Sequence, residues 1–372
     1  MKVKIATGLT LAALVIGLLI YTRPDVQLVS PPTANAERST QQSQREDRTR
    51  GNALANSQMD SQPAEETPAT TNLLTQLLKG GDCPRLTLEQ ADAFVAQRNR
   101  HVEGLLAASD STGDRKYLNE AMEKFPNDPR VAFRAAFQAS DANGDGPNET
   151  RRKWLDVFQQ NAPDNALPDY LSAAEHFRAG EPGKAFAELA SASKKQMDDY
   201  SQDFLLNNEE AYRNAGYSEA EAKMIASISL LLPQEAQFRS VGRSLVDLAN
   251  GYRKAGDEAS AQAALQMALD LGQRLNTPHS LTLIEPLVGI AIQRQAYGAM
   301  DPNAIFGNSG QTVQTYIDGL SQQRDAIKQV AQRWNTYMPR MSEPDVTAYL
   351  NRQWLYGEQA ASRWMAGRLG LQ

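Results

Sequence analysis

The sequence is poor in the residues that build most metal and nucleophile sites. Its 372 residues include one cysteine and three histidines, which excludes a disulfide framework and a metal site made of several thiolate or imidazole ligands. A positive charge excess is missing too, because 38 Lys and Arg face 44 Asp and Glu, for a net charge of −6. Proteins that bind duplex DNA normally carry a basic surplus, so we expect no nucleic-acid partner.

Familiar catalytic motifs are also absent. The sequence has no glycine-rich phosphate loop after a strand, no nucleophile elbow and no HExxH motif, and we expect no cofactor. One partial calcium loop is present, with Asp141, Asn143 and Asp145 at its first, third and fifth positions. Its twelfth position is Arg152, where a bidentate Glu is needed, and this favours a plain turn over a weak calcium site.

A long hydrophobic run occurs only at the N-terminus. Lys2 and Lys4 precede the uncharged stretch from Ile5 to Tyr21, and Arg23 follows it. At about 1.5 Å per residue such a stretch is at the short end of a membrane crossing. A cleavable signal peptide has the same layout, but no small-x-small site follows directly, which favours an uncleaved anchor. Both interpretations place the rest of the chain outside the cytoplasm, in the periplasm of a Gram-negative cell.

The chain divides into four predicted parts. Residues 1–23 are the anchor, and residues 24–72 are a linker rich in Ser, Thr, Gln and Pro that has too little apolar surface to offset its ordering entropy. From residue 73 onward the apolar residues recur with a helical period, which predicts an all-α fold. We divide this region into a helical domain at 73–310 and a C-terminal cap or interaction region at 311–372.

Capping and turn residues punctuate the helical pattern. Thr87 and Gln90 form a capping box that predicts a helix as far as about Ser109. Asn148 can cap a helix that ends near Asn161. Four glycines are expected at helix ends, where a left-handed residue is wanted. They are Gly180, Gly216, Gly256 and Gly272.

Residues 242–274 resemble a tetratricopeptide (TPR) repeat over almost all of its unit of about 34 residues. Leu245 and Tyr252 lie on the apolar stripe of the first helix, Ala249 is the small residue at the helix crossing, and Gly256-Asp257 forms the turn. A weaker match covers Leu167–Leu189. The resemblance implies antiparallel helix pairs stacked as a TPR-like solenoid with a C-terminal helical cap. A helical bundle without repeats is the alternative.

The resemblance also implies a concave groove, lined by the first helix of each pair, that takes a peptide or a partner helix. The implied groove residues are Arg243, Val246, Asn250, Arg253 and Lys254 in the better match and Leu171, Glu175 and Arg178 in the weaker one. Basic and amide side chains on one helix face can hold a carboxylate or a peptide backbone. The alternative is a solvated face with basic residues favoured by the helix dipole.

Aromatic residues gather near the C-terminus. The candidate interface residues there are Trp334, Tyr337, Trp354 and Trp364. An apolar stripe that caps the open end of the solenoid accounts for them, and we favour this interpretation. The alternative is a recognition surface, because Trp and Tyr are common at interface hot spots.

One acidic residue, Glu285, stands within the apolar stretch LTLIEPLVGIAI. Two interpretations are open for it. It is either a buried carboxylate with a raised pKa and Arg294 as its partner, or a residue at a bend before Pro286 whose carboxylate reaches water. The second interpretation is favoured, because a residue before proline usually avoids helical geometry.

These features together predict a membrane-anchored, extracytoplasmic helical-repeat scaffold that binds a protein or peptide partner in envelope assembly or secretion. Two alternatives remain. An α-helical glycan-acting hydrolase would need two carboxylates facing each other about 5–10 Å apart, and a structural envelope protein would need no discrete site. An acidic, aromatic-lined pocket would favour the hydrolase, whereas an open superhelix with a smooth groove would favour the scaffold.

Overall fold

The computed structural model describes residues 73–78, 81–140, 148–337 and 340–370. The predicted anchor, the linker and the partial calcium loop with Asp141, Asn143 and Asp145 lie outside these residues. Within the described part, none of the helices has the length and apolar character needed to cross a membrane.

The described residues form helices joined by turns, which confirms the predicted all-α class. The helices in chain order are α2 (Leu73–Leu78), α3 (Leu88–Gln97), α4 (Val102–Thr112), α5 (Arg115–Lys124), α6 (Pro129–Ser140), α7 (Glu149–Asn161), α8 (Leu167–Arg178), α9 (Pro182–Ala192), α10 (Ser201–Asn214), α11 (Glu219–Ser229), α12 (Gln234–Lys254), α13 (Glu258–Leu275), α14 (Ile284–Gly298), α15 (Val313–Tyr337), α16 (Glu343–Tyr356) and α17 (Glu358–Arg368).

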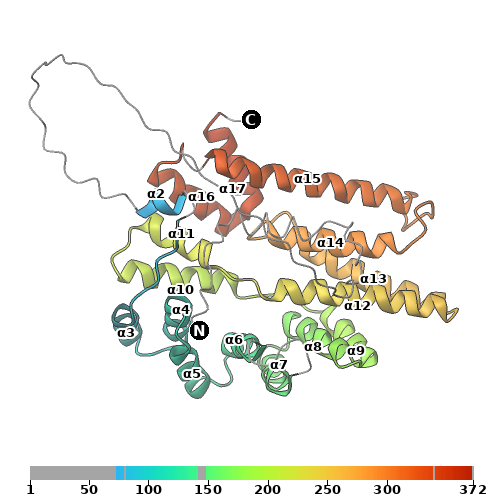
Figure 1. Ribbon diagram of the computed structural model, residues 1–372, viewed down its shortest axis with the longest axis horizontal. Helices are drawn as coiled ribbons and strands as arrows, with labels where there is room; N and C mark the ends of the chain where they lie inside the picture. The colour runs from blue at the N-terminus through green and yellow to red at the C-terminus, as the bar shows by residue number, and fades with distance from the viewer. Residues whose placement is uncertain (1–72, 79–80, 141–147, 338–339, 371–372) are drawn as a thin grey trace, which may run out of the picture.

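Helices that follow one another in the chain pack as pairs, as predicted for stacked hairpins. The most extensive pairs are α12 with α13, α13 with α14, α6 with α7, and α8 with α9. Contacts between distant parts of the chain are added to these pairs: α12 also packs on α8 and α14, α10 on α4, and α11 on α16. Helices α10 to α12 therefore run between the N-terminal helices and the C-terminal helices (Figure 1).

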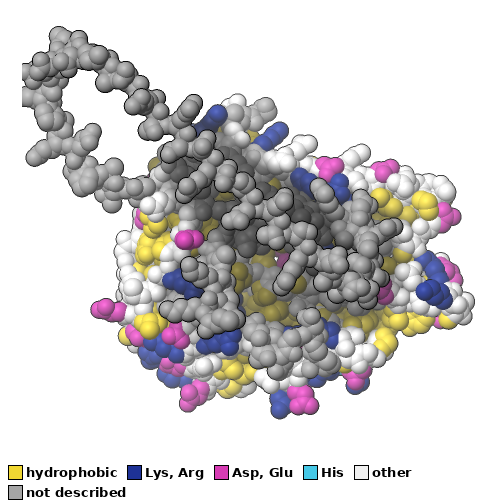
Figure 2. All heavy atoms as spheres, viewed as in Figure 1, with side chains coloured by type: hydrophobic (Ala, Val, Ile, Leu, Met, Phe, Trp, Pro, Cys, Tyr) yellow, Lys and Arg dark blue, Asp and Glu magenta, His cyan; other side chains and the backbone are white. Residues whose placement is uncertain are grey.

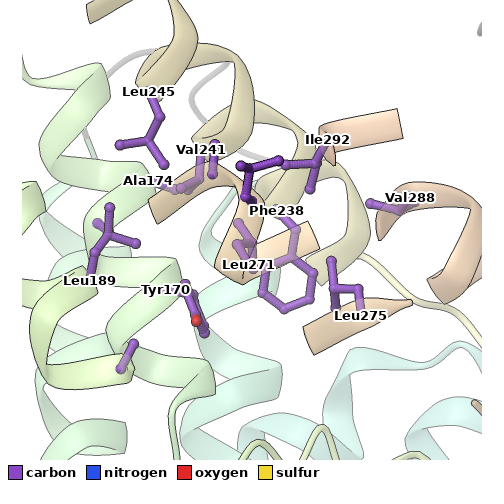
Figure 3. Close-up of a cluster of buried hydrophobic side chains, with 14 of the residues drawn as sticks. Tyr170, Ala174, Leu189, Phe238, Val241, Leu245, Leu271, Leu275, Val288 and Ile292 are labelled. Atoms are coloured by element: carbon purple, nitrogen blue, oxygen red, sulfur yellow. The ribbon is translucent and has the colours of Figure 1, made fainter. Parts of the chain in front are cut away.

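The main core lies where α8, α9, α12, α13 and α14 meet. Figure 3 shows side chains from all five helices pointing toward one another. The labelled residues are Tyr170, Ala174, Leu189, Phe238, Val241, Leu245, Leu271, Leu275, Val288 and Ile292. Since α12 contributes to this core along its length, its rotation about its own axis is fixed by packing.

The hairpins expected from the TPR resemblance are present as α12–α13 and α8–α9. Gly256 has a φ of 82° in the first turn, and the side chain of Asp257 accepts a hydrogen bond from the Ser260 amide at 3.0 Å to cap α13. Ala249 of α12 is fully buried in the core. These features also occur in other helical hairpins, so the repeat assignment stays a prediction.

The capping residues show where the sequence pattern worked and where it failed. The capping box of Thr87 and Gln90 is formed, and Asn148 accepts a hydrogen bond from the Arg151 amide at 3.1 Å. The prediction of a single helix from Thr87 to about Ser109 is wrong, because the structure divides this segment into α3 and α4. Asn99 and Arg100 between them adopt left-handed φ angles of 52° and 51°, which an α-helix does not allow.

Three of the four glycines expected at helix ends have positive φ there, and Gly272 does not. It lies inside α13, where a Cβ atom would be 2.7 Å from the carbonyl oxygen of Gly289 in α14. A Cβ on Gly289 would be 2.4 Å from the carbonyl oxygen of Gly272. The two glycines therefore allow the backbones of α13 and α14 to approach closely, instead of ending a helix.

We predict that Gly289→Ala lowers the free energy of unfolding by about 1–3 kcal/mol, because the added methyl group forces the α13 and α14 backbones apart. Gly251→Ala in α12 is the matched control, since its Cβ would have no neighbour within 4 Å. It should stabilise the fold by about 0.5–1 kcal/mol through helix propensity. Urea unfolding measures both, and equal effects at the two sites would contradict the close approach.

Candidate functional site

The structure separates the predicted groove residues into buried and exposed groups. Leu171 and Glu175 of α8 are only 3% and 2% exposed, so neither lines an open groove. The carboxylate of Glu175 accepts hydrogen bonds from the guanidinium groups of Arg151 and Arg178. The resemblance assigns both positions to the surface of a repeat, whereas here α7 and α12 pack against α8 and cover them.

On α12 the predicted groove face is only partly available. Val246 is half-buried against the core. The guanidinium group of Arg253 already donates hydrogen bonds to the carboxylate of Glu258, at 3.1 Å, and to the carbonyl oxygen of Ala299. The remaining three residues have exposed side chains, and a groove along them stays a prediction. They are Arg243, Asn250 and Lys254.

The C-terminal aromatic residues make internal contacts. Tyr337 and Trp354 are 2% and 9% exposed, and the indole nitrogen of Trp354 donates to the Ser227 hydroxyl at 3.2 Å. Trp334 packs on Tyr349 with ring centres 4.5 Å apart. Trp364 is half-buried, and the guanidinium carbon of Arg352 lies 3.9 Å from its ring centre. These contacts are those of a structural cap, which supports the predicted cap over the interface.

A cavity of about 290 Å³ lies where α10, α12 and α14 begin. Its lining residues come from the turn before α10, from the ends of α10, α12, α13 and α14, and from the segment between α13 and α14. They are Met197, Asp198, Asp199, Tyr200, Ser201, Gln202, Asp203, Glu235, Phe238, Leu275, Leu281 and Glu285. Phe238 and Leu275 also belong to the core, where they lie next to each other in Figure 3. Asp198 and Gln202 are exposed, so the cavity reaches the surface at this turn.

Five carboxyl groups and no Lys, Arg or His side chain belong to the described residues that line this cavity. Elsewhere the molecule is mixed: on the visible coloured part of the face in Figure 2, acidic and basic side chains are interspersed. The local excess of acid is therefore a property of the cavity, since the whole chain has a net charge of only −6.

The turn before α10 holds its acidic residues in a strained conformation. Tyr200 has a φ of 57°, an uncommon value for a bulky residue. Its amide donates to the Asp198 carboxylate at 2.9 Å, and the Asp199 carboxylate accepts from the Ser201 amide at 3.0 Å and from the Gln234 side chain at 2.8 Å. Strained turns of this kind are enriched at functional sites.

Glu235 is the most unusual residue of the cavity. It is 5% exposed, and its Oε2 atom has no hydrogen-bond partner among the described residues. Burial, together with the nearby charges of Glu285 and Asp199, raises its pKa well above the usual range. A buried carboxyl group that leaves an oxygen unpaired is costly, and such groups are normally satisfied by a partner.

Glu285 is half-buried, and it has the raised pKa of the less favoured interpretation. Loss of water, with the charge of Asp199, raises its pKa to about 8, and its carboxylate accepts a hydrogen bond from the Thr282 hydroxyl at 3.4 Å. The bend of the favoured interpretation is wrong, because Glu285 lies in the first turn of α14, with Pro286 tolerated at the next position. Arg294 makes no ion pair with it among the described residues.

The C-terminal helices hold one wall of the cavity in place. Gln353 of α16 donates to the carbonyl oxygen of Leu281 at 3.2 Å, and Glu358 of α17 accepts from the Leu283 amide at 2.7 Å. Burial raises the pKa of Glu358 to about 7, against the opposing effect of that hydrogen bond. The segment that leads to Glu285 is therefore fixed by residues about 70 positions further along the chain.

This arrangement can offer hydrogen-bond donors from protonated carboxyl groups, or negative charge from ionised ones. No group of three or more His, Cys, Asp or Glu side chains in the described part has the geometry of a metal site. Sequence reasoning missed Glu235, although a signal was present: it lies one turn before Phe238, at the start of the apolar stripe Phe238, Val241 and Leu245.

Comparison with known proteins adds no assignment. The chain matches no family model, no curated protein and no solved structure. The functional argument therefore depends on the geometry of the cavity and on the sequence features described above.

We predict that Glu285→Gln stabilises the protein more at pH 8.5 than at pH 5. The pKa of Glu285 rises from the usual 4.5 to about 8 on folding. The free energy of unfolding of the wild type is therefore highest below about pH 4.5, where Glu285 is protonated in both states, and it falls as the pH rises through 8. Glutamine stays neutral, so the difference from the wild type should reach on the order of a few kcal/mol at high pH.

Thermal unfolding at a series of pH values measures this difference. Glu258→Gln is the control, because its carboxylate is exposed on α13 and should give no gain that grows with pH. A Glu285→Gln difference that is constant from pH 5 to pH 8.5 would contradict the raised pKa of Glu285.

Proposed function

We propose that this protein is a membrane-anchored helical scaffold that binds a protein or peptide partner outside the cytoplasmic membrane, in envelope assembly or secretion. The N-terminal lysines and the uncharged run after them support the location. The TPR resemblance of residues 242–274 supports the class of scaffold. The observation that carries the binding role is the acidic cavity with its buried Glu235.

The size of the cavity favours binding over catalysis on a large substrate. Ligand pockets usually measure about 300–1,000 Å³, so a cavity of about 290 Å³ takes one side chain or one small molecule. A glycan-cleaving site must hold sugar units on both sides of the bond that breaks, and this needs an extended cleft. The cavity is therefore better suited to anchoring a single group of a partner.

Helix α12 connects the cavity with the predicted groove face. Glu235 lies at its start, and the exposed Asn250 lies 15 residues further on, which is about 22 Å along the helix. A partner peptide of roughly seven extended residues covers that distance. One partner could thus contact the exposed face of α12 and insert a side chain into the cavity.

We predict that a photo-crosslinking amino acid at Gln202 forms a discrete adduct with a partner in the membrane fraction of intact cells. Gln202 is exposed at the cavity opening. Gln262 is the control, because it is exposed on α13 about 20 Å along that helix from the cavity residue Leu275. The adduct should form from Gln202 and not from Gln262. Equal labelling from both positions, or none from Gln202, would contradict the proposal.

A glycan-acting hydrolase is the second candidate, and Glu285 favours it. A carboxyl group with a pKa near 8 is protonated at neutral pH and can donate a proton to a leaving group. Tyr200 and Phe238 supply aromatic surface in the same cavity, and Asp199 and Asp203 supply further carboxylates. This is the acidic, aromatic-lined pocket that a hydrolase on a helical fold would show.

The hydrolase candidate predicts that the purified full chain releases soluble fragments from peptidoglycan, and that Glu285→Gln slows this release by at least about 100-fold, the usual contribution of a general acid. Glu258→Gln should have no effect, because its carboxylate is outside the cavity. A full chain without glycan-cleaving activity, or activity that survives in Glu285→Gln, would reject this candidate and leave the scaffold.

A further inference from the structure

The chemistry of the cavity narrows the kind of group that it can hold. Its described lining residues contribute five carboxyl groups and no basic side chain, so an anion would find no basic partner and would be repelled by the carboxyl groups that are ionised. Oε2 of Glu235 has no hydrogen-bond partner among the described residues, and a purely apolar group would leave it so. A cationic hydrogen-bond donor resolves both problems, because it supplies charge and N–H groups together.

We infer that the cavity binds a single organic cation, an ammonium or guanidinium group on a short aliphatic stem, with the carboxylate of Glu235 as its counter-ion. This inference rests on the proposed function and names the group by which the partner is held. A lysine or arginine side chain of the partner and a free amine share this chemistry, and the experiment below distinguishes the two sources.

The shape of the wall matches such a ligand. Glu235, Phe238 and Leu275 form the buried end of the lining, while Asp198 and Gln202 form its exposed end. Apolar side chains between these ends can contact the methylene groups of a lysine or arginine stem, as such stems commonly pack on apolar surface. The side chain of Tyr200, which also lines the cavity, can add a cation–π contact.

Binding of a cation is expected to release protons. Glu235 on α12 is influenced by Glu285 on α14 and by Asp199 before α10, and burial together with these charges raises the pKa of its carboxyl group well above the usual range. Asp203 on α10 lies 3.7 Å from the guanidinium of Arg130 on α6, so part of its charge is already neutralised. A bound cation favours the ionised form of Glu235, which must then lose its proton to water.

Asp198 and Tyr200 complete the titratable groups that line the cavity. Asp198 is exposed, and its carboxylate accepts a hydrogen bond from the Tyr200 amide. Burial raises the pKa of the Tyr200 hydroxyl above its usual value of 10, so the hydroxyl stays neutral. On the far side of the wall, Glu358 of α17 accepts the Leu283 amide. Affinity for a cation should therefore increase with pH, because protons compete for Glu235 and Glu285.

The test is calorimetric titration of the full chain in detergent with N-acetyl-arginine methylamide, and with its neutral citrulline counterpart. The arginine derivative should bind with one-to-one stoichiometry, and the citrulline derivative should bind roughly 10- to 100-fold more weakly. Glu235→Gln should weaken arginine binding by a similar factor, whereas Glu258→Gln outside the cavity should bind like the wild type. Equal affinity for arginine and citrulline derivatives would overturn the inference.

A second measurement keeps the test valid if Glu235→Gln does not fold. Titration of the wild type at pH 7 in phosphate and in HEPES, which differ in ionisation enthalpy and neither of which is a primary amine, gives the number of protons released on binding. We expect proton release on cation binding and tighter binding at pH 8 than at pH 6. Arginine binding without proton release, and with no change in affinity over this range, would show that Glu235 is not the counter-ion.

The source of the cation is decided by two further probes. Putrescine represents a free amine, and an acetylated Gly-Arg-Gly amide represents a partner side chain. Tighter binding of the peptide identifies a side chain, and tighter binding of putrescine identifies a free amine. Failure of all cations, together with a specific adduct at Gln202, would reject the inference and keep the proposed function. Cation binding without any adduct at Gln202 would reject the proposed function and keep the cation site.

Discussion

The packing of α12 fixes the position of the candidate site. Phe238, Val241 and Leu245 occupy the core between α8 and the α13–α14 pair, so α12 cannot rotate without exposing them. Glu235 lies one turn before Phe238 and on the same helix face, because residues three apart are neighbours on a helix. The apolar stripe that stabilises the core therefore buries an acidic side chain at its first position. The cavity lies at this end of the stripe, where α12 and α14 begin and where the turn before α10 supplies the remaining lining residues.

This burial has a cost that the surrounding backbone reduces. Asp203, Glu235 and Glu285 each lie in the first turn of a helix, where the exposed N–H groups act as a partial positive charge and favour negative side chains. For all three residues the loss of water outweighs this benefit, and their pKa values are raised. The fold also leaves Oε2 of Glu235 without a hydrogen-bond partner among the described residues, and a cationic ligand would supply one.

Much of the fold was predictable from local sequence, and the candidate site only in part. Caps such as Thr87 and Asn148 and the turn at Gly256 depend on neighbouring residues, and the structure has them where the sequence indicates. The role of Gly272 depends on the approach of α14, which local sequence does not show. The division of the first predicted helix at Asn99 and Arg100 depends on left-handed backbone angles that no glycine announces. Glu285 was noticed because it stands in an apolar stretch. The sequence did not single out Glu235, because the repeat resemblance begins at Gly242, after the first turn of α12 in which Glu235 lies.

The C-terminal aromatic residues influence the cavity without facing it. Trp354 is held between the Ser227 hydroxyl and the ammonium group of Lys223, which lies 4.4 Å from its ring centre, and this contact fixes α16 against α11. With α16 in place, Gln353 and Glu358 reach the segment before α14 and bind its carbonyl and amide groups. That segment leads directly into the turn that carries Glu285. A change in the cap would therefore act on the cavity wall through this segment, whereas the direct packing of α14 on α12 and α13 would still hold the core together.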